Sequence, residues 1–147
     1  GHTHSDIGIT RQRTIYSLRT VLPITIALII AAGLFLLLEK PRFSPTEGIG
    51  FYVFYILISC PAQELLFRGI LSRMLQELRL HRVLELGVAA ALFGYAHIIY
   101  GDMLTVVVMS IVGIVWYRAY QRSSSLIGVT MSHVVLGVMT IALGIID

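Results

Sequence analysis

Charged residues and cysteines are both scarce in this chain. Only 13% of its 147 residues are charged, whereas a soluble domain usually carries about 25%. The single cysteine, Cys60, excludes an intrachain disulfide. The 11 lysines and arginines form no basic patch with interleaved aromatics, so nucleic acid is not an expected partner. What remains is 56% hydrophobic, with a mean hydropathy of +0.84, which indicates a lipid bilayer as the surroundings.

Uncharged runs predict membrane-spanning helices. A hydrocarbon core about 30 Å thick needs about 20 helical residues, and arginines at the ends of shorter runs can reach the interface. The chain shows no strand-like alternation and no internal repeat. We expect an all-α polytopic membrane protein whose single transmembrane domain covers residues 20–147. The five expected spans are 20–39, 49–70, 85–100, 102–119 and 125–146.

Basic residues alternate between successive loops. Arginines precede the first span, follow the second and precede the fifth, while the other two loops are neutral or acidic. The positive-inside rule then places residues 1–19 in the cytoplasm. We therefore expect an integral membrane protein, with a bacterial inner membrane as its expected location.

Two features modify the second span. Pro61 lacks one helix hydrogen bond, so it should kink or restart the helix just before Gln63. Residues 70–85 alternate leucine and methionine with arginine, glutamine, glutamate and histidine. This pattern is typical of an amphipathic helix, and we expect it to extend span two along the cytoplasmic interface.

A carboxylate and a guanidinium inside the second span are the most informative feature. Glu64 and Arg68 stand four residues apart, and such charges are costly in hydrocarbon unless they are paired or face a wet cavity. His97 and His133 lie in other apolar stretches, at depths similar to Glu64 if a helix rises about 1.5 Å per residue. The pattern indicates a buried polar site that handles protons or water. Glu64 and Arg68 could also form a merely structural pair, and a lone histidine is commonly an interhelical hydrogen-bonding residue.

These residues resemble the three motifs of the CPBP family of intramembrane proteases, which includes CAAX prenyl proteases and bacteriocin self-immunity proteins. The family pattern is Glu-Glu-xxx-Arg, Phe-xxx-His and His-xxx-Asn on separate membrane helices. Here the chain reads Gln63-Glu64-xxx-Arg68, then Phe93-xxx-His97, then His133, all within residues 48–146. The resemblance implies a multi-helix hydrolase. In it, the first Glu and the second-motif His activate water, while the last His and Asn stabilise the oxyanion.

The chain departs from this pattern at two positions. Gln63 stands where the family has its first Glu, and a carboxamide accepts no proton at ordinary pH. Gly137 stands where Asn follows the last His, so that donor to an oxyanion is missing. Either the chain is active through a shifted arrangement, or it keeps the fold without the chemistry; a glutamine at position 63 is also the change that would inactivate such an enzyme.

The favoured interpretation is an intramembrane endopeptidase acting on a membrane-embedded or membrane-associated protein or peptide. Glu64 and His97 would prepare a water, with Arg68 orienting Glu64 and Gln63 holding the water. His133 would bind the developing oxyanion. We expect Gln63 or Glu64, His97 and His133 to meet in one cavity.

Other interpretations stay open. A non-catalytic membrane protein that binds or regulates a partner fits Gln63 and Gly137. A zinc enzyme using Glu64, His97 and His133 would have three ligands and an open position, but no close-spaced metal motif supports it. A proton-coupled transporter is a further alternative, and the lack of a detectable internal repeat argues weakly against it. We expect no cofactor and no structural zinc, and the sequence carries no signal of oligomeric state.

Overall fold

The computed structural model describes residues 10–146, and all regular elements in this part of the chain are helices, with no strand. Its elements, in chain order, are α1 (Arg11–Leu38), α2 (Ile49–Phe54), the π turn η2 (Tyr55–Ser59), α3 (Cys60–Glu64), the π turn η3 (Leu65–Ile70), α4 (Leu71–Glu77), α5 (Arg82–Tyr95), the 3₁₀ turn η4 (Ala96–Tyr100), α6 (Met103–Ser123) and α7 (Leu126–Ala142).

The protein is an integral membrane protein. Among the described residues, four helical segments are long and apolar enough to cross a bilayer: Arg11–Leu38, Ile49–Glu77, Arg82–Tyr100 and Met103–Ser123. Leu126–Ala142 is apolar but shorter, at 17 residues. The expected all-α polytopic architecture is thus confirmed. The fifth expected span corresponds to this shorter helix, because the chain turns at Leu143 and Gly144 before residue 146.

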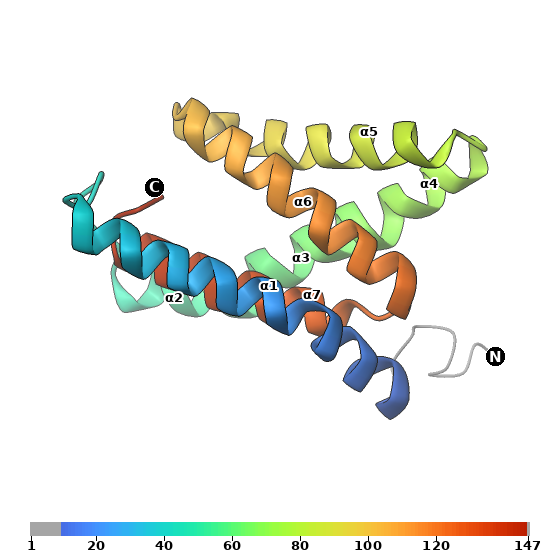
Figure 1. The fold of residues 1–147 in the computed structure, drawn as a ribbon, viewed down its shortest axis with the longest axis horizontal. Coiled ribbons are helices and arrows are strands. Elements are labelled where there is room, and N and C mark those ends of the chain that lie inside the picture. The colour runs from blue at the N-terminus through green and yellow to red at the C-terminus, as the bar shows by residue number, and fades with distance from the viewer. Residues whose placement is uncertain (1–9, 147) are drawn as a thin grey trace.

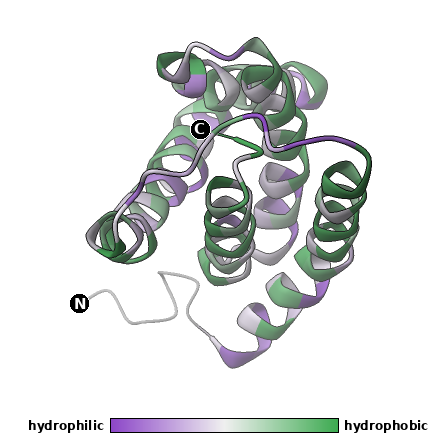
Figure 2. Cartoon of the chain, turned by 90° about the vertical axis from the view of Figure 1, so that its left-hand side faces the viewer, coloured by the Kyte–Doolittle hydropathy of each residue, from purple (hydrophilic) through white to green (hydrophobic). Residues whose placement is uncertain are grey.

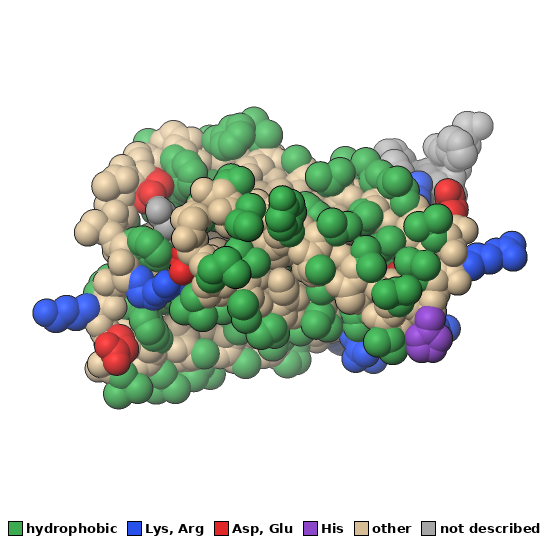
Figure 3. Space-filling model, turned by 90° about the horizontal axis from the view of Figure 1, so that it is seen from above, with side chains coloured by type: hydrophobic (Ala, Val, Ile, Leu, Met, Phe, Trp, Pro, Cys, Tyr) green, Lys and Arg blue, Asp and Glu red, His purple; other side chains and the backbone are tan. Residues whose placement is uncertain are grey.

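The surface fits a lipid environment. Large apolar side chains such as Leu22, Leu57 and Ile111 are exposed, although a soluble protein would bury most of them. Seen end-on, the helices are hydrophobic around most of their circumference (Figure 2). Charged side chains gather towards the two ends of the long axis, and the middle is largely hydrophobic (Figure 3). This distribution is what a bilayer imposes on a spanning protein.

Neighbouring helices pack against one another as follows. α5 and η4 lie against α6, while α1 lies across α7 and α6 (Figure 1). The segment from α2 to α4 runs diagonally behind them and contacts α7 through η2 and α3. α1 can approach α7 closely because Gly128 has no side chain: a Cβ there would overlap Ser17. Such small residues drive helix packing where the hydrophobic effect is weak.

The second segment is one long helix interrupted twice. The π turn η2 ends at Ser59. The N–H of Cys60, the next residue, bonds the Tyr55 carbonyl, and Pro61 follows in the first turn of α3. A proline cannot donate to the helix ladder, and a π turn is a known way to accommodate that loss. The predicted break before Gln63 is therefore confirmed. A second π turn, η3, follows Glu64 directly.

The amphipathic helix predicted over 70–85 is not one element. α4 continues the second segment only to Glu77, and the chain then turns through Arg79, whose φ is 50°. α5 begins at Arg82, so residues 82–85 belong to the third span. An amphipathic pattern cannot reveal this, since both helix ends at an interface carry the same mixed composition. α1 likewise begins at Arg11, earlier than the expected start at residue 20.

The core lies where α1, α5, α6 and α7 meet. Phe93 and Trp116 are its large fully buried side chains, and Val129 of α7 packs against them. Ser132 ties this region together: it is hydrogen-bonded to Thr25 of α1 at 2.6 Å and accepts from the Trp116 indole at 3.0 Å. The residue after Ser132 is His133, so this network fixes the position of that ring.

Candidate functional site

Gln63 and Glu64 are neighbours on α3 with different surroundings. Gln63 is half-buried on the wall of a cavity, and its amide bonds the Ser59 hydroxyl at 3.0 Å. Glu64 is fully enclosed, with 0% of its surface exposed. The difference follows from helix geometry, because consecutive side chains point about 100° apart.

Glu64 holds two partners from opposite sides. Its Oε1 lies 2.7 Å from His133 Nδ1 on α7, and its Oε2 lies 3.2 Å from Arg68 Nε one turn along the same segment. All three side chains are buried, at 0%, 3% and 1% exposed. A buried carboxylate is costly unless it is paired and hydrogen-bonded. The Glu64–Arg68–His133 triad meets that requirement and joins α7 to the second segment.

The Arg68 guanidinium is satisfied mainly by aromatic faces. Its Cζ lies 4.0 Å from the centroid of the Phe93 ring and 5.5 Å from that of Trp116. Within the described residues its terminal nitrogens have no hydrogen-bond acceptor, and its Nε meets Glu64 at ion-pair distance without hydrogen-bond alignment. Cation–π contacts are strongest when desolvated, as here. Arg68 therefore neutralises Glu64 without competing for the oxygen that faces His133.

Both site histidines have one ring nitrogen already occupied. His97 Nδ1 lies 2.8 Å from the Phe93 carbonyl, and since a carbonyl only accepts, Nδ1 must carry the proton. His133 Nδ1 faces the Glu64 carboxylate, which also accepts. Both rings line the same cavity. Nε2 is therefore the nitrogen of each histidine that could act in the cavity.

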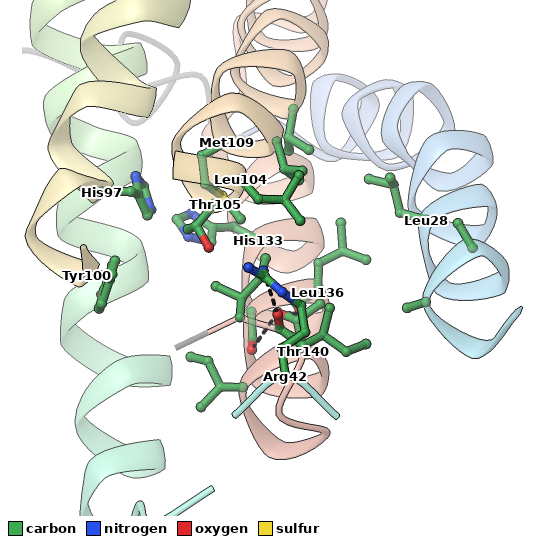
Figure 4. Close-up of a pocket in the computed structure, with 18 of the residues that line it drawn as sticks. Leu28, Arg42, His97, Tyr100, Leu104, Thr105, Met109, His133, Leu136 and Thr140 are labelled. Carbon is green, nitrogen blue, oxygen red and sulfur yellow. Dashed lines mark hydrogen bonds between the residues drawn. The ribbon is translucent and has the colours of Figure 1, made fainter. Parts of the chain in front are cut away.

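The cavity has a volume of about 300 Å³ and is mostly apolar. Figure 4 shows His97 and Tyr100 from η4, His133 and Leu136 from α7, and Leu28 from α1 around it. Gln63 and Tyr55 also belong to the polar part of the wall. An apolar cavity with a few convergent polar groups is the usual form of a ligand site.

The structure thus brings Gln63, His97 and His133 onto one cavity, as we expected for these residues. Glu64 and Arg68 do not line that cavity. Glu64 contacts His133 Nδ1, and Arg68 contacts Glu64. Glu64 can therefore act on a ligand only through the His133 ring. Adjacent residues in a sequence cannot reveal this, because their faces depend on the exact helix register.

Two aromatic residues of the site carried no sequence signal. The Trp116 ring lies 4.7 Å from the His133 ring, and the Tyr55 ring lies 6.2 Å from it, edge-on. A π turn and an α-helical turn separate Tyr55 from Gln63. A search of the sequence with the α-helical period of 3.6 residues therefore does not place the two residues on one face. Trp116 is the chain's only tryptophan, but it stands in an apolar run, where a tryptophan is as expected in a packed core as in a site.

An ion pair lies beside the cavity. Arg42, in the loop after α1, lines the cavity and bonds both carboxylate oxygens of Asp102, at 2.8 and 3.0 Å. Asp102 also caps α6 by accepting from the backbone and hydroxyl of Thr105. These contacts, with Arg42 first, hold the pKa of the Asp102 carboxyl well below its ordinary value and raise that of Arg42.

The residues present do not fit a metal ion. No group of three or more His, Cys, Asp and Glu suited to a metal occurs within residues 10–146. Glu64 and His133 point at each other, with Arg68 on the second carboxylate oxygen, so zinc would have to displace an arginine. The zinc interpretation with Glu64, His97 and His133 finds no support in this arrangement.

Comparison with known proteins identifies the family. A family model described as "Type II CAAX prenyl endopeptidase Rce1-like" matches residues 45–139. The match contains all three motif segments and most of the cavity wall outside α1. Searches of curated proteins and of solved structures found no match. The matched region covers more than half of the chain, and the chain therefore belongs to the type II CAAX prenyl endopeptidase Rce1-like family.

Proposed function

We propose that this protein is an intramembrane endopeptidase that hydrolyses a peptide bond in a membrane-associated protein or peptide. One observation carries the proposal: His97 and His133 line one cavity, and each has its Nδ1 bonded away from it. Nε2 is then the nitrogen of each ring that the proposal assigns to the chemistry in the cavity. Two pre-oriented imidazoles in an apolar cavity suit proton transfer to and from a reacting group.

His97 is the general base in this proposal. Its Nδ1–H donates to the Phe93 carbonyl, so the neutral ring presents a lone pair on Nε2. A water held by the Gln63 amide attacks the substrate carbonyl, and His97 Nε2 takes its proton. The same proton then passes to the leaving amine, which restores neutral His97. Gln63 positions the water but takes no proton.

His133 binds the developing oxyanion in its imidazolium form. Glu64 is the counterion for that form at 2.7 Å, and Nε2–H is then a donor facing the cavity. With Glu64 negative, and Arg68 and imidazolium His133 positive, the triad carries one net positive charge. Such fixed charge in a dry site stabilises an oxyanion far better than it would in water. Arg68 and Glu64 are positioning residues, since neither touches the substrate.

The cavity and the family both support the proposed substrate class. The cavity is largely apolar and lies between helices that cross the bilayer, so it suits a hydrophobic segment or a lipid-modified chain end. The family name refers to prenylated CAAX carboxyl termini. A test panel should hold quenched fluorescent peptides of two kinds, one with a lipid-modified Cys-aliphatic-aliphatic-X terminus and one with an apolar membrane anchor.

Activity of the purified protein in proteoliposomes tests the proposal. His97→Ala should lower turnover by about 10²-fold or more, the usual contribution of a general base. His81→Asn is the matched control, since His81 is an exposed histidine at the start of α5 and should leave turnover unchanged. Equal rates for the wild type and His97→Ala would refute His97 as the base. No turnover of either peptide would refute the peptidase proposal.

A second candidate is a non-catalytic protein on the same fold that binds a membrane peptide. It is favoured by the lack of a carboxylate among the described residues that line the cavity: Gln63 lines it, while Glu64 is fully buried elsewhere. Under this alternative, wild type and Gln63→Glu would both bind the anchored peptide in vesicles and neither would cleave it.

A further inference from the structure

Tyr55 is placed against the site by the π turn it begins. The residue is buried, with 8% of its surface exposed, and its ring stacks on Phe51 with centroids 5.9 Å apart. Its ring meets His133 edge-on, and it lines the same cavity as His133. A tyrosine has a hydroxyl donor at the end of an apolar ring, so a buried one usually directs that hydroxyl at a polar partner.

Gly137 and Tyr55 occupy the same space. Gly137 lies one helical turn after His133 on α7 and also lines the cavity. A Cβ on residue 137 would overlap the Tyr55 hydroxyl oxygen, and would lie 2.7 Å from Cζ and 2.8 Å from Cε1 of that ring. No side chain fits there while Tyr55 is present. The glycine and the tyrosine are therefore one feature: the volume beside His133 that a side chain at 137 would fill is filled by a phenol.

We propose that the Tyr55 hydroxyl is the second donor to the substrate's carbonyl oxygen, beside His133. The proposal rests on the peptidase function proposed above. It assigns to Tyr55 the hydrogen bond that residue 137 cannot provide, because glycine has no side-chain donor. Tyrosine hydroxyls are among the groups that stabilise oxyanions in enzymes. Tyr55 is thus a catalytic residue that gives up no proton: it donates a hydrogen bond to the oxyanion and keeps its O–H.

That bond would form in the cavity, which Tyr55 lines beside His133. The neighbour of the hydroxyl on the protein side is the Cys60 thiol, one π turn further along the same segment. A thiol sulfur is a weak acceptor, whereas a bond to an ionised oxygen is about twice as strong as one between neutral groups. As negative charge develops on the substrate oxygen, the stronger acceptor takes the hydroxyl. The interaction is therefore one that grows towards the transition state, which is the kind that raises kcat.

The first test is Tyr55→Phe in proteoliposomes, with the peptide that the wild type cleaves. The phenylalanine keeps the stack on Phe51 and the packing on Gly137, and removes only the hydroxyl. We expect kcat to fall about 10²–10³-fold, as for loss of one oxyanion donor, with KM nearly unchanged. Tyr52→Phe is the matched control, because Tyr52 packs in the same apolar cluster but does not line the cavity.

A reciprocal exchange separates this role from packing. Gly137→Asn alone should be inactive, because its side chain overlaps Tyr55. Tyr55→Ala removes both ring and donor, and adding Gly137→Asn to it supplies a donor from α7. We expect the double variant to turn over at least about 10-fold faster than Tyr55→Ala alone, which is part of what one such donor provides.

The outcomes are distinct. If the wild type cleaves and Tyr55→Phe retains its kcat, the inference is overturned while the peptidase function stands. The same holds if the double variant regains thermal stability but no turnover. If the wild type cleaves neither peptide, the peptidase function fails, and the role of Tyr55 fails with it.

Discussion

Two ion pairs lie near the same cavity in very different surroundings. Glu64 and Arg68 are enclosed, at 0% and 1% exposed, whereas the Arg42 and Asp102 side chains are 27% and 14% exposed. The charges are of the same kind and the Arg42 pair has the better geometry, with two short hydrogen bonds. Burial, not geometry, decides what each pair contributes. The enclosed pair cannot be solvated if it is broken, while water can replace either partner of the open one.

The difference indicates different roles. The open pair connects the loop after α1 to the start of α6, and its Arg42 lines the cavity. The enclosed pair is joined to His133 and holds that ring towards the cavity. A protein retains an enclosed charge in a membrane only where the charge does something that an apolar side chain cannot. This contrast supports a functional Glu64–Arg68–His133 triad and a structural Arg42–Asp102 pair.

Breaking the enclosed pair should have the largest effect. Arg68→Met leaves Glu64 buried with only His133 as a partner, and should lower the free energy of unfolding by about 3–5 kcal/mol. Removing both charges with Glu64→Leu/Arg68→Met should recover much of that loss. Thermal unfolding in detergent measures both. A melting temperature for Arg68→Met equal to that of the wild type would show that the pair is solvated after all.

Moving a carboxylate from the sealed position to the cavity should have the next largest effect. Gln63→Glu places a proton acceptor on the cavity wall, and should raise kcat by about 10²-fold, which is close to 2.7 kcal/mol of barrier. Glu64→Gln keeps the shape of the triad but removes the counterion of His133, and should lower kcat. Peptide cleavage in proteoliposomes compares the variants. If Gln63→Glu leaves kcat unchanged, the carboxylate is not limiting at the cavity wall.

The open pair should contribute little on its own. A double-mutant cycle with Arg42→Gln and Asp102→Asn should give a coupling of roughly 0.2–1 kcal/mol, as for other pairs in contact with water. Raising the salt concentration should reduce that coupling, while the Glu64–Arg68 coupling should not respond, since salt screens exposed charges far more than buried ones. Equal salt dependence of the two couplings would remove the distinction between the pairs.

Acid should affect the open pair in a defined direction. The pKa of Asp102 is lower in the folded protein than its ordinary value of about 3.9, so the folded state favours the charged form. This stabilisation is present above about pH 4 and is lost as the pH falls further. As the pH is lowered from about 5 to about 3, the wild type should therefore lose more stability than Asp102→Asn. Parallel losses would show that Asp102 is not responsible.

Metal removal should have no effect. A metal at the site would have to replace Arg68 as the partner of Glu64, and the triad has no vacancy for it. Treatment with a chelator should leave both melting temperature and turnover unchanged. Loss of turnover that zinc alone restores would overturn the assignment of Glu64 as the counterion of His133.

The membrane architecture was largely predictable, because a bilayer leaves few choices. Hydrocarbon excludes charge and requires backbone groups to bond within each segment, so uncharged runs had to be helices. The break at Pro61 was also predictable from its missing N–H. Helix ends at the interface were not: residues 70–85 look alike along their length, yet the chain turns at Arg79 and starts a new helix at Arg82.

The sequence by itself determined which residues could meet. Glu64, Arg68, His97 and His133 are rare groups in apolar segments, and their shared depth follows from a fixed rise per residue. Only the tertiary structure decided which of them face the cavity. The two π turns around α3 set the helix register. In that register Gln63 lines the cavity, and Glu64 contacts Arg68 and His133. Tyr55 against Gly137 was likewise undetermined until α7 packed on η2. Those outcomes depend on rotations of a fraction of a helical turn and on contacts between distant segments, and neither is encoded in local periodicity.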